Sequence, residues 1–292
     1  MVITVILDAA MEEEVHVSGL TPGKSHRAER TKIHPGGRGL VAAMAAHTLS
    51  GRCAVLGAVA GAEGEYIRDE LDRLGIPNDL ILSHGRMPVN LRLIDGERET
   101  FIRAQGSTVT EGQLEQIWQK LNDLAEPGDV VLLAGELPRA MTPERLVRWT
   151  ERLSDEGVFV VLETEMDRRD LTARPAVLIT GPAALCGMGL AAEREAVIEA
   201  ARQLIADGVR GVVVPQAGGR VLFVRKDEAL CVTTPRPLDG SAMAARIAVG
   251  LSHDESWKNI AVCSVAAGTG LEPVSIGQQP SAGPAWEVEQ IG

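Results

Sequence analysis

The sequence predicts an α/β protein of three layers, with a mostly parallel central sheet, helices on both of its faces and a small β-sheet lid. The first observation is that short, β-branched, continuously apolar runs alternate with longer helical patterns along most of the 292 residues. Such runs are typical of strands buried on both faces of a parallel sheet. The second is that residues 13–34 and 88–104 alternate apolar with charged residues, as strands with one solvated face do.

The elements of the main sheet follow from these runs in chain order. Its strands are predicted at VITVIL (2–7), CAVLGAVA (53–60), DVVLLAG (129–135), VFVVLET (158–164), PAVLIT (175–180) and VRGVVVP (209–215). Helices are predicted at EGEYIRDELDRLGI (63–76), TPERLVRWTERLSDEG (142–157) and REAVIEAARQLIADG (194–208). Parallel strands need long crossover connections of this kind. We therefore expect a single α/β domain over residues 1–292.

The two alternating stretches are expected to form a sheet of their own. The second contains Asp95–Gly96, a dipeptide that favours a tight hairpin turn. A small sheet inserted into a parallel α/β chain is suited to cover a cleft as a lid. The same pattern also fits an edge extension of the main sheet or the surface of a homodimer that pairs through the lid.

The overall charge restricts the classes of partner. The formal net charge is −11 at pH 7, so most of the surface repels phosphate backbones, which argues against nucleic acid and against an anionic membrane. No apolar run has the length needed to span a bilayer, and the cysteines lack the spacing of a metal site. We expect a cytoplasmic protein without a dedicated metal site, in which any phosphate site is local.

Paired glycines precede an alanine-rich helix at HPGGRGLVAAMAAHTL (34–49). Gly36 and Gly37 let the backbone approach a ligand closely, and the N–H groups at the helix start favour an anion. Arg38 is suited to hold a phosphate with a forked contact. The alternative is a tight structural turn without a ligand.

A second helix start follows the proline-interrupted segment TTPRPLD (233–239). Gly240 and Ser241 do little to shield the free N–H groups of the first helical turn, so this end is suited to hold a phosphate. The alternative is that Asp239 is an N-cap, whose carboxylate accepts hydrogen bonds from the same amides.

Several of these stretches, taken in order, resemble a known family. They are TVILDAAMEEEV (4–15), HPGGRGLVAAMAAHTL (34–49), GAVAGAEGEYIRDELDRLGI (57–76), PVNLRLID (88–95), GDVVLLAGELP (128–138) and AVCSVAAGTG (261–270). The chain resembles the PfkB (ribokinase-like) carbohydrate kinases, and within them the 1-phosphofructokinase and tagatose-6-phosphate kinase branch. The resemblance implies a ribokinase-like fold, a sugar or sugar phosphate held between the main domain and the lid, and ATP with Mg²⁺ near the C-terminal helices.

The resemblance also implies a catalytic motif. In the family, an aspartate that ends a Gly-Ala-Gly-Asp motif takes the proton from the sugar hydroxyl, and neighbouring amides form an anion hole. Here Leu238, Asp239, Gly240 and Ser241 stand at that motif, so serine occupies the position of the base. The kinase hypothesis therefore assigns the base to a displaced Asp239 and the anion hole to Gly240 and Ser241.

The nucleotide motifs of the family are replaced by neutral residues. The Lys-Pro-Asn-x-x-Glu stretch falls on residues 179–184 (ITGPAA), and the Ser/Thr-x-Gly loop falls on residues 215–217 (PQA). Nucleotide triphosphates need cationic and metal-bridged neutralisation. These departures count against ATP binding.

The substrate motifs are better preserved. Glu12 stands where the family has a substrate-binding aspartate, Asn90 is matched, and arginines replace two lysines. The candidate substrate-binding residues are Glu12, Gly36, Gly37, Arg38, Asn90, Arg92 and Arg103. The three arginines would make a compact basic pocket, or would be solvated and paired with nearby acids.

Two functional hypotheses remain open. The first is an ATP- and Mg²⁺-dependent kinase that acts on a sugar or sugar phosphate. The second is a catalytically inactive descendant without a nucleotide cofactor, which binds a sugar phosphate or small anion as a binding or regulatory protein. A different reaction that uses Glu136, Glu163 or Glu165 near strand ends is a third possibility, whose alternative is that these carboxylates are solvated.

Overall fold

A computed structural model of the chain describes residues 1–104, 109–187, 193–270 and 287–291. In the described residues the main sheet has ten strands. In sheet order they are β14 (Glu287–Gln290), β13 (Ala229–Thr233), β12 (Arg220–Val224), β11 (Val212–Gln216), β10 (Val177–Ile179), β9 (Phe159–Glu163), β8 (Val130–Ala134), β1 (Val2–Ile6), β4 (Cys53–Ala60) and β5 (Asn78–Ser83). Neighbours from β5 to β11 run parallel, and β12, β13 and β14 extend the sheet by antiparallel pairs. The predicted mostly parallel sheet is confirmed.

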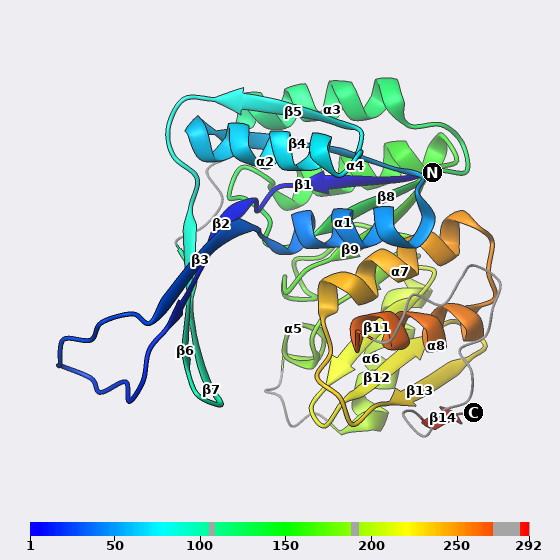
Figure 1. Cartoon of the computed structure of the whole chain (residues 1–292). Coiled ribbons are helices and arrows are strands. Elements are labelled where there is room, and N and C mark those ends of the chain that lie inside the picture. The colour runs from blue at the N-terminus through cyan, green and yellow to red at the C-terminus, as the bar shows by residue number, and fades with distance from the viewer. Residues whose placement is uncertain (105–108, 188–192, 271–286, 292) are drawn as a thin grey trace.

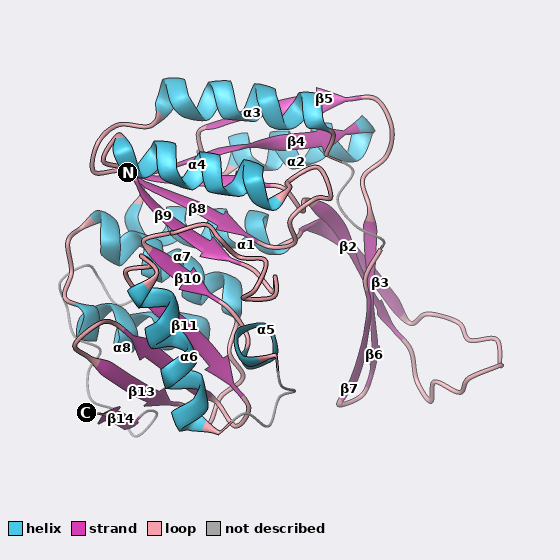
Figure 2. Cartoon of the chain, turned by 180° about the vertical axis from the view of Figure 1, so that it is seen from behind, coloured by secondary structure: helices cyan, strands magenta, loops and turns pink. Residues whose placement is uncertain are grey.

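Helices cover both faces of this sheet (Figures 1 and 2). One face is packed by α1 (Arg38–Ser50), α2 (Gly61–Arg73), α7 (Gly240–Ser252) and α8 (Trp257–Gly268). The other is packed by α3 (Glu111–Leu124), α4 (Pro143–Asp155), α5 (Pro182–Cys186) and α6 (Arg194–Ala206). Successive residues of a strand point to opposite faces, which is why the continuously apolar strands supply both cores. Within the described residues, no helix is long and apolar enough to cross a membrane.

The predicted strands and helices of the main domain form within a few residues of their expected bounds, but β5, α3, α5, β12, β13 and β14 were not predicted. The signal for α3 is local, since Thr110 and Gln113 form a capping box at its start. The strands β12 and β13 form because their apolar residues are buried between the two helical layers.

The lid is a separate four-stranded sheet in the order β3 (Arg30–Gly36), β2 (Ala10–His16), β6 (Val89–Asp95) and β7 (Arg98–Ile102). It projects from the main domain (Figure 1). The alternative of an edge extension of the main sheet is therefore wrong, and the lid starts at Ala10 rather than at residue 13. The hairpin between β6 and β7 turns at Gly96, with φ +60°, as Asp95–Gly96 predicted.

The strand register gives the lid two unlike faces. Glu12 lies opposite His34 and Asn90, and this row faces the main domain, where Glu12 and Asn90 line a pocket. In the next row, Glu13 lies between Ile33 and Leu91. These side chains point away from the main domain, because side chains alternate between the two faces along each strand. The apolar residues on this outer side are Val15, Ile33, Val89, Leu91, Leu93 and Ile102.

Candidate active site

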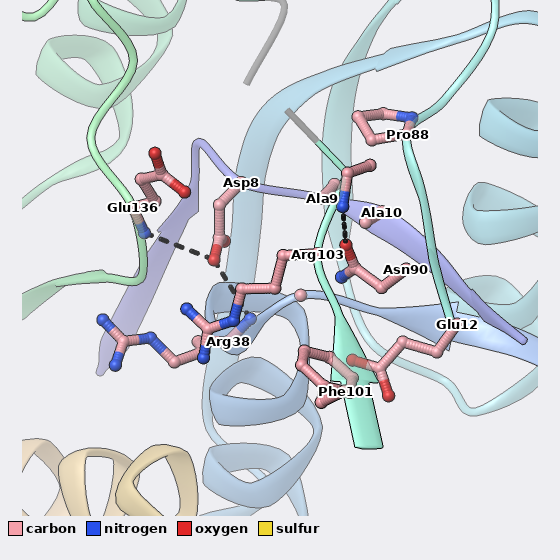
Figure 3. Close-up of a pocket in the computed structure, with 12 residues that line it drawn as sticks. Asp8, Ala9, Ala10, Glu12, Arg38, Pro88, Asn90, Phe101, Arg103 and Glu136 are labelled. Atoms are coloured by element: carbon pink, nitrogen blue, oxygen red, sulfur yellow. Dashed lines mark hydrogen bonds between the residues drawn. The ribbon is translucent and has the colours of Figure 1, made fainter. Parts of the chain in front are cut away.

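The Asp8 carboxylate joins three segments where the chain leaves β1. It accepts hydrogen bonds from the amides of Arg38 (3.1 Å), Gly39 (3.1 Å) and Glu136 (3.4 Å). Figure 3 shows the bonds from Arg38 and Glu136. Gly135 has φ +99°, and a Cβ there would lie 2.6 Å from Asp8 Oδ1. Burial raises the pKa of Asp8, and its three amide hydrogen bonds act in the opposite direction.

These hydrogen bonds occupy two of the N–H groups at the start of α1 that a bound anion would need. The amides of Arg38 and Gly39 are already bound to Asp8, so in this structure they hold a carboxylate of the protein itself. Gly37 has φ +93°, and a Cβ there would collide with the Asp8 carbonyl. A Cβ on Gly36 would lie 2.7 Å from the Glu12 carboxyl carbon. The paired glycines therefore allow close packing of Asp8 and Glu12.

A pocket of about 80 Å³ lies between the lid and the main domain (Figure 3). It brings together five of the predicted substrate residues, which are Glu12, Gly37, Arg38, Asn90 and Arg103. The Asn90 side-chain oxygen accepts a hydrogen bond from the Ala104 amide at 3.0 Å, which ties β6 to the chain after β7. The Arg103 guanidinium lies over the Phe101 ring, 5.5 Å from its centroid.

Two of the predicted substrate residues do not line this pocket. Gly36 lies behind the Glu12 side chain, as described above. Arg92 is on the same face of the lid, but its guanidinium is paired with Glu99 at 2.7 Å and with Glu14 at 3.5 Å. Of the three predicted arginines, Arg38 and Arg103 line this pocket, together with the carboxylates of Asp8, Glu12 and Glu136. Arg92 is instead paired with nearby acids, as in the alternative.

A second cavity, of about 590 Å³, lies beside the carboxyl ends of β9, β10 and β11 and the start of α7. Its lining includes residues 179–183 and 215–216, from the two stretches that the resemblance assigns to the nucleotide. Arg220 and Arg236 also line it, and neither guanidinium has an ion-pair partner in the described part of the chain. Sequence reasoning missed both arginines, because no motif marks them.

Arg38 lines both cavities and is paired with Glu163, at 3.2 Å between Nη1 and Oε1. Glu163 ends β9 and is only 7% exposed, and its Oε2 is buried without a hydrogen-bond partner among the described residues. Burial raises the pKa of Glu163 most, and the negative charges of Asp8 and Glu165 also raise it, whereas the Arg38 guanidinium and the nearby Gly135 amide lower it.

The Asp239 side chain caps its own helix. Its Oδ1 accepts from the amides of Ser241 (2.9 Å) and Ala242 (3.3 Å), as in the N-cap alternative. A displaced base would have to leave these amides, and the predicted anion hole would have to lose its present acceptor. Gly240 does line the second cavity, and a Cβ placed on it would lie 3.7 Å from Glu163 Oε1.

Three layers of helix, parallel sheet and helix, with a separate lid over a pocket at the carboxyl ends of the strands, define a ribokinase-like α/β protein. The chain belongs to the pfkB family of carbohydrate kinases, whose model matches residues 4–268. It is 25% identical to a 1-phosphofructokinase of Bacillus subtilis over 243 residues, which cover 81% of this chain and 78% of that protein.

Solved structures show the same fold. Phosphofructokinase-2 from Escherichia coli in complex with fructose-6-phosphate superposes with a TM-score of 0.83 at 19% identity, over 92% of each chain. The tetrameric inhibited form of the same enzyme superposes with a TM-score of 0.82 at 18% identity, over 94% of each chain. At these identities the likeness extends to the fold alone.

Proposed function

We propose that this protein is an ATP-dependent kinase that transfers a phosphoryl group to a hydroxyl of a fructose phosphate. One observation carries the proposal, namely that Arg38 lines both the pocket under the lid and the cavity at the start of α7. A sugar phosphate in the first and the phosphates of a nucleotide in the second would both lie beside this guanidinium. Enzymes catalyse phosphoryl transfer mostly by positioning the two substrates and by stabilising the charge on the transferred group.

The acceptor is assigned to the pocket under the lid. Arg38 and Arg103 supply positive charge on a protein of net charge −11, and Glu12 and Asn90 supply hydrogen-bonding groups for sugar hydroxyls. A phosphorylated sugar needs both kinds of group. The relative from Bacillus subtilis is named 1-phosphofructokinase, and the Escherichia coli structure holds fructose-6-phosphate. A ketohexose phosphate is therefore the proposed acceptor class.

The donor is assigned to the second cavity. Arg220 and Arg236 fit the charge of a triphosphate, since neither is neutralised by an ion pair with another described residue. No group of three or more His, Cys, Asp or Glu side chains in the described residues is arranged to hold a metal ion. Mg²⁺ that arrives on a nucleotide keeps phosphate oxygens and water as ligands and does not require such a group. When bound, it would offset charge on the phosphates.

A coupled assay with Mg²⁺ and ATP tests the proposal, with fructose 1-phosphate and fructose 6-phosphate as separate acceptors. We expect turnover of at least one acceptor, and Arg38→Ala is expected to lower kcat/KM by about 10²-fold to 10³-fold, the usual effect of losing one charge-stabilising donor. Arg92→Ala is the matched control, because Arg92 is paired with Glu99 and Glu14 outside the pocket. No nucleotide turnover with either acceptor would contradict the proposal.

The second candidate is a non-catalytic protein that binds a sugar phosphate or small anion. It is favoured by the cap at α7, where the family's base position holds Ser241 and the neighbouring carboxylate of Asp239 is bound to its own helix. A thermal-shift panel separates the two candidates. The kinase is stabilised by Mg-ATP and by a sugar phosphate, whereas the non-catalytic protein is stabilised by the sugar phosphate or another small anion alone.

The proposed partner is a second copy of the chain, bound through the outer face of the lid. Ile33, Val89 and Ile102 on that face are 54%, 42% and 51% exposed, and contiguous exposed apolar surface marks an interface. One related structure is a tetrameric form of phosphofructokinase-2.

Ile102→Glu is expected to convert the dimer to a folded monomer, because it places a charge on the exposed apolar outer face of the lid without disturbing the core. Light scattering after size exclusion measures the mass. Leu124→Glu, at a residue 36% exposed at the end of α3, is the control that should keep the dimer. A wild-type protein that is monomeric at all concentrations would contradict this assignment.

A further inference from the structure

The proposed phosphoryl transfer needs a group that accepts the proton of the attacking hydroxyl. In the family the resemblance assigns this role to an aspartate at the start of the last motif, and Ser241 occupies that position here. Asp239 is two residues earlier, and its carboxylate is hydrogen-bonded to the amides of Ser241 and Ala242. A serine hydroxyl near its usual pKa is a poor base. The base must therefore come from another element that reaches the start of α7.

The geometry of β9 brings a carboxylate to this point. Glu163 is the last residue of β9, at the carboxyl end of the strand, beside the start of α7. Its Oε1 would lie 3.7 Å from a Cβ on Gly240. It lines the second cavity together with Gly240 and Arg38. The carboxylate thus lies next to the helix start where the family carries its base, although it comes from the other side of the cavity.

The hydrogen bonding of Glu163 leaves one oxygen for a ligand. Oε1 is paired with the Arg38 guanidinium at 3.2 Å, whereas Oε2 has no hydrogen-bond partner among the described residues. The residue is only 7% exposed. A buried carboxylate oxygen without a donor costs free energy, and native proteins leave few of them. A hydroxyl donor from a ligand in the cavity would satisfy it.

The neighbouring carboxylates are less suited to the role. Both oxygens of Asp8 are occupied by the amides of Arg38, Gly39 and Glu136. The side chains of Glu136 and Glu165 are exposed, so water solvates them and keeps them weakly basic. Glu163 is the carboxylate that combines burial, an unused oxygen and a place at the start of α7.

We propose that Glu163 is the general base of the reaction, replacing the aspartate that the family carries on the last helix. The inference rests on the proposed kinase function. The acceptor hydroxyl gives its proton to Glu163 Oε2 as its oxygen forms a bond to the γ-phosphorus of the nucleotide. The bond from that phosphorus to the β–γ bridging oxygen breaks, and the electron pair leaves on the nucleoside diphosphate. Glu163 then returns its proton to water.

The surroundings of Glu163 suit this cycle. Burial raises its pKa, which brings a carboxylate closer to neutral pH and makes it a stronger base. The Arg38 guanidinium opposes this effect and favours the ionised form that accepts the proton, while the negative charges of Asp8 and Glu165 favour the protonated form that the reaction produces. These are the charged groups that face Glu163 from β1, α1 and the chain after β9.

Glu163→Gln tests the inference, because glutamine keeps the shape and removes the base. We expect kcat to fall by about 10²-fold to 10⁴-fold, the usual contribution of a general base, while the KM for the sugar phosphate changes by less than tenfold. The melting temperature in the presence of the sugar phosphate is expected to rise as in the wild type. Glu163→Asp should recover part of the lost kcat, since it restores a carboxylate one methylene shorter.

Two controls keep the outcomes separate. Glu70→Gln removes a carboxylate that is paired with Arg73 at 2.6 Å on the surface, and it should leave kcat unchanged. If the wild type turns over no nucleotide with any sugar phosphate, the proposed function fails. If the wild type is active and Glu163→Gln keeps its kcat, or if turnover collapses in Asp239→Asn but persists in Glu163→Gln, the assignment of Glu163 fails while the kinase function stands.

Discussion

Asp8→Ala is expected to lower the free energy of unfolding by about 3 kcal/mol and to abolish binding of the sugar phosphate. The substitution removes the acceptor of three amides, those of Arg38, Gly39 and Glu136, in a buried place. Each buried donor left without an acceptor costs about 1–3 kcal/mol, and water entering the space recovers part of the sum. Urea unfolding measures the change, as a lower midpoint at an unchanged slope.

The functional loss follows from the same contacts. Asp8 holds the first turn of α1 against the ends of β1 and β8, and Arg38 is the first residue of that helix. When the turn relaxes, the guanidinium leaves its place between the two cavities. Asp79→Ala is the control, because the Asp79 ion pair with Lys120 is on the surface and contributes about 0–1 kcal/mol. An Asp8→Ala protein with wild-type stability and turnover would contradict the assigned role.

The sheet and the lid could be predicted from the sequence because their signals are local. Continuous apolar runs such as 53–60 and 130–134 became strands buried on both faces, and the alternating stretches became a separate sheet. The apolar outer face of the lid needed the register, which pairs Glu13 with both Ile33 and Leu91. Alternation shows that two faces differ, but it does not show which rows of neighbouring strands coincide.

The site could be predicted only where the residues stand in motifs. Glu12, Arg38 and Asn90 meet in the pocket under the lid, as their positions in the resemblance implied. Arg220 and Arg236 come to the second cavity from the start of β12 and from the loop before α7. Their convergence depends on the antiparallel pairing of β12 with β13, which was not predicted.

In the folded protein, the neutral residues of the nucleotide motifs do not leave the cavity without charge. Position by position, residues 179–184 lack the lysine and glutamate of the family motif, and residues 215–217 lack its Ser/Thr and glycine. The cavity that these stretches line nevertheless holds three arginines and two glutamates, which are Arg38, Arg220, Arg236, Glu163 and Glu165. The electrostatic potential at a bound ligand depends on the charges near it, whichever segment of the chain supplies them. This is the physical reason to keep the kinase proposal ahead of the inactive descendant.

Arg246→Ala is expected to destabilise the protein by about 3–5 kcal/mol, the usual cost of leaving a buried charge without its partner. Arg246 is 1% exposed, and its Nη2 donates to both oxygens of Glu255, at 3.0 and 2.8 Å. Glu255 lies between α7 and α8 and also accepts from Asn259 at 3.0 Å. The pair thus ties the middle of α7 to the turn that follows it.

A double variant separates the ion pair from packing. Arg246→Met with Glu255→Leu removes both charges and keeps much of the volume, so its free energy of unfolding should be higher than that of Arg246→Ala, because no buried charge is left unpaired. If the double variant is less stable than the single one, the two residues act by shape and not by charge.

The ion pair also affects the site, because α7 runs from this pair to Gly240 at the second cavity. A helix held firmly in the core keeps its first residue fixed beside Glu163, so Arg246→Ala should also lower kcat under conditions where the variant remains folded.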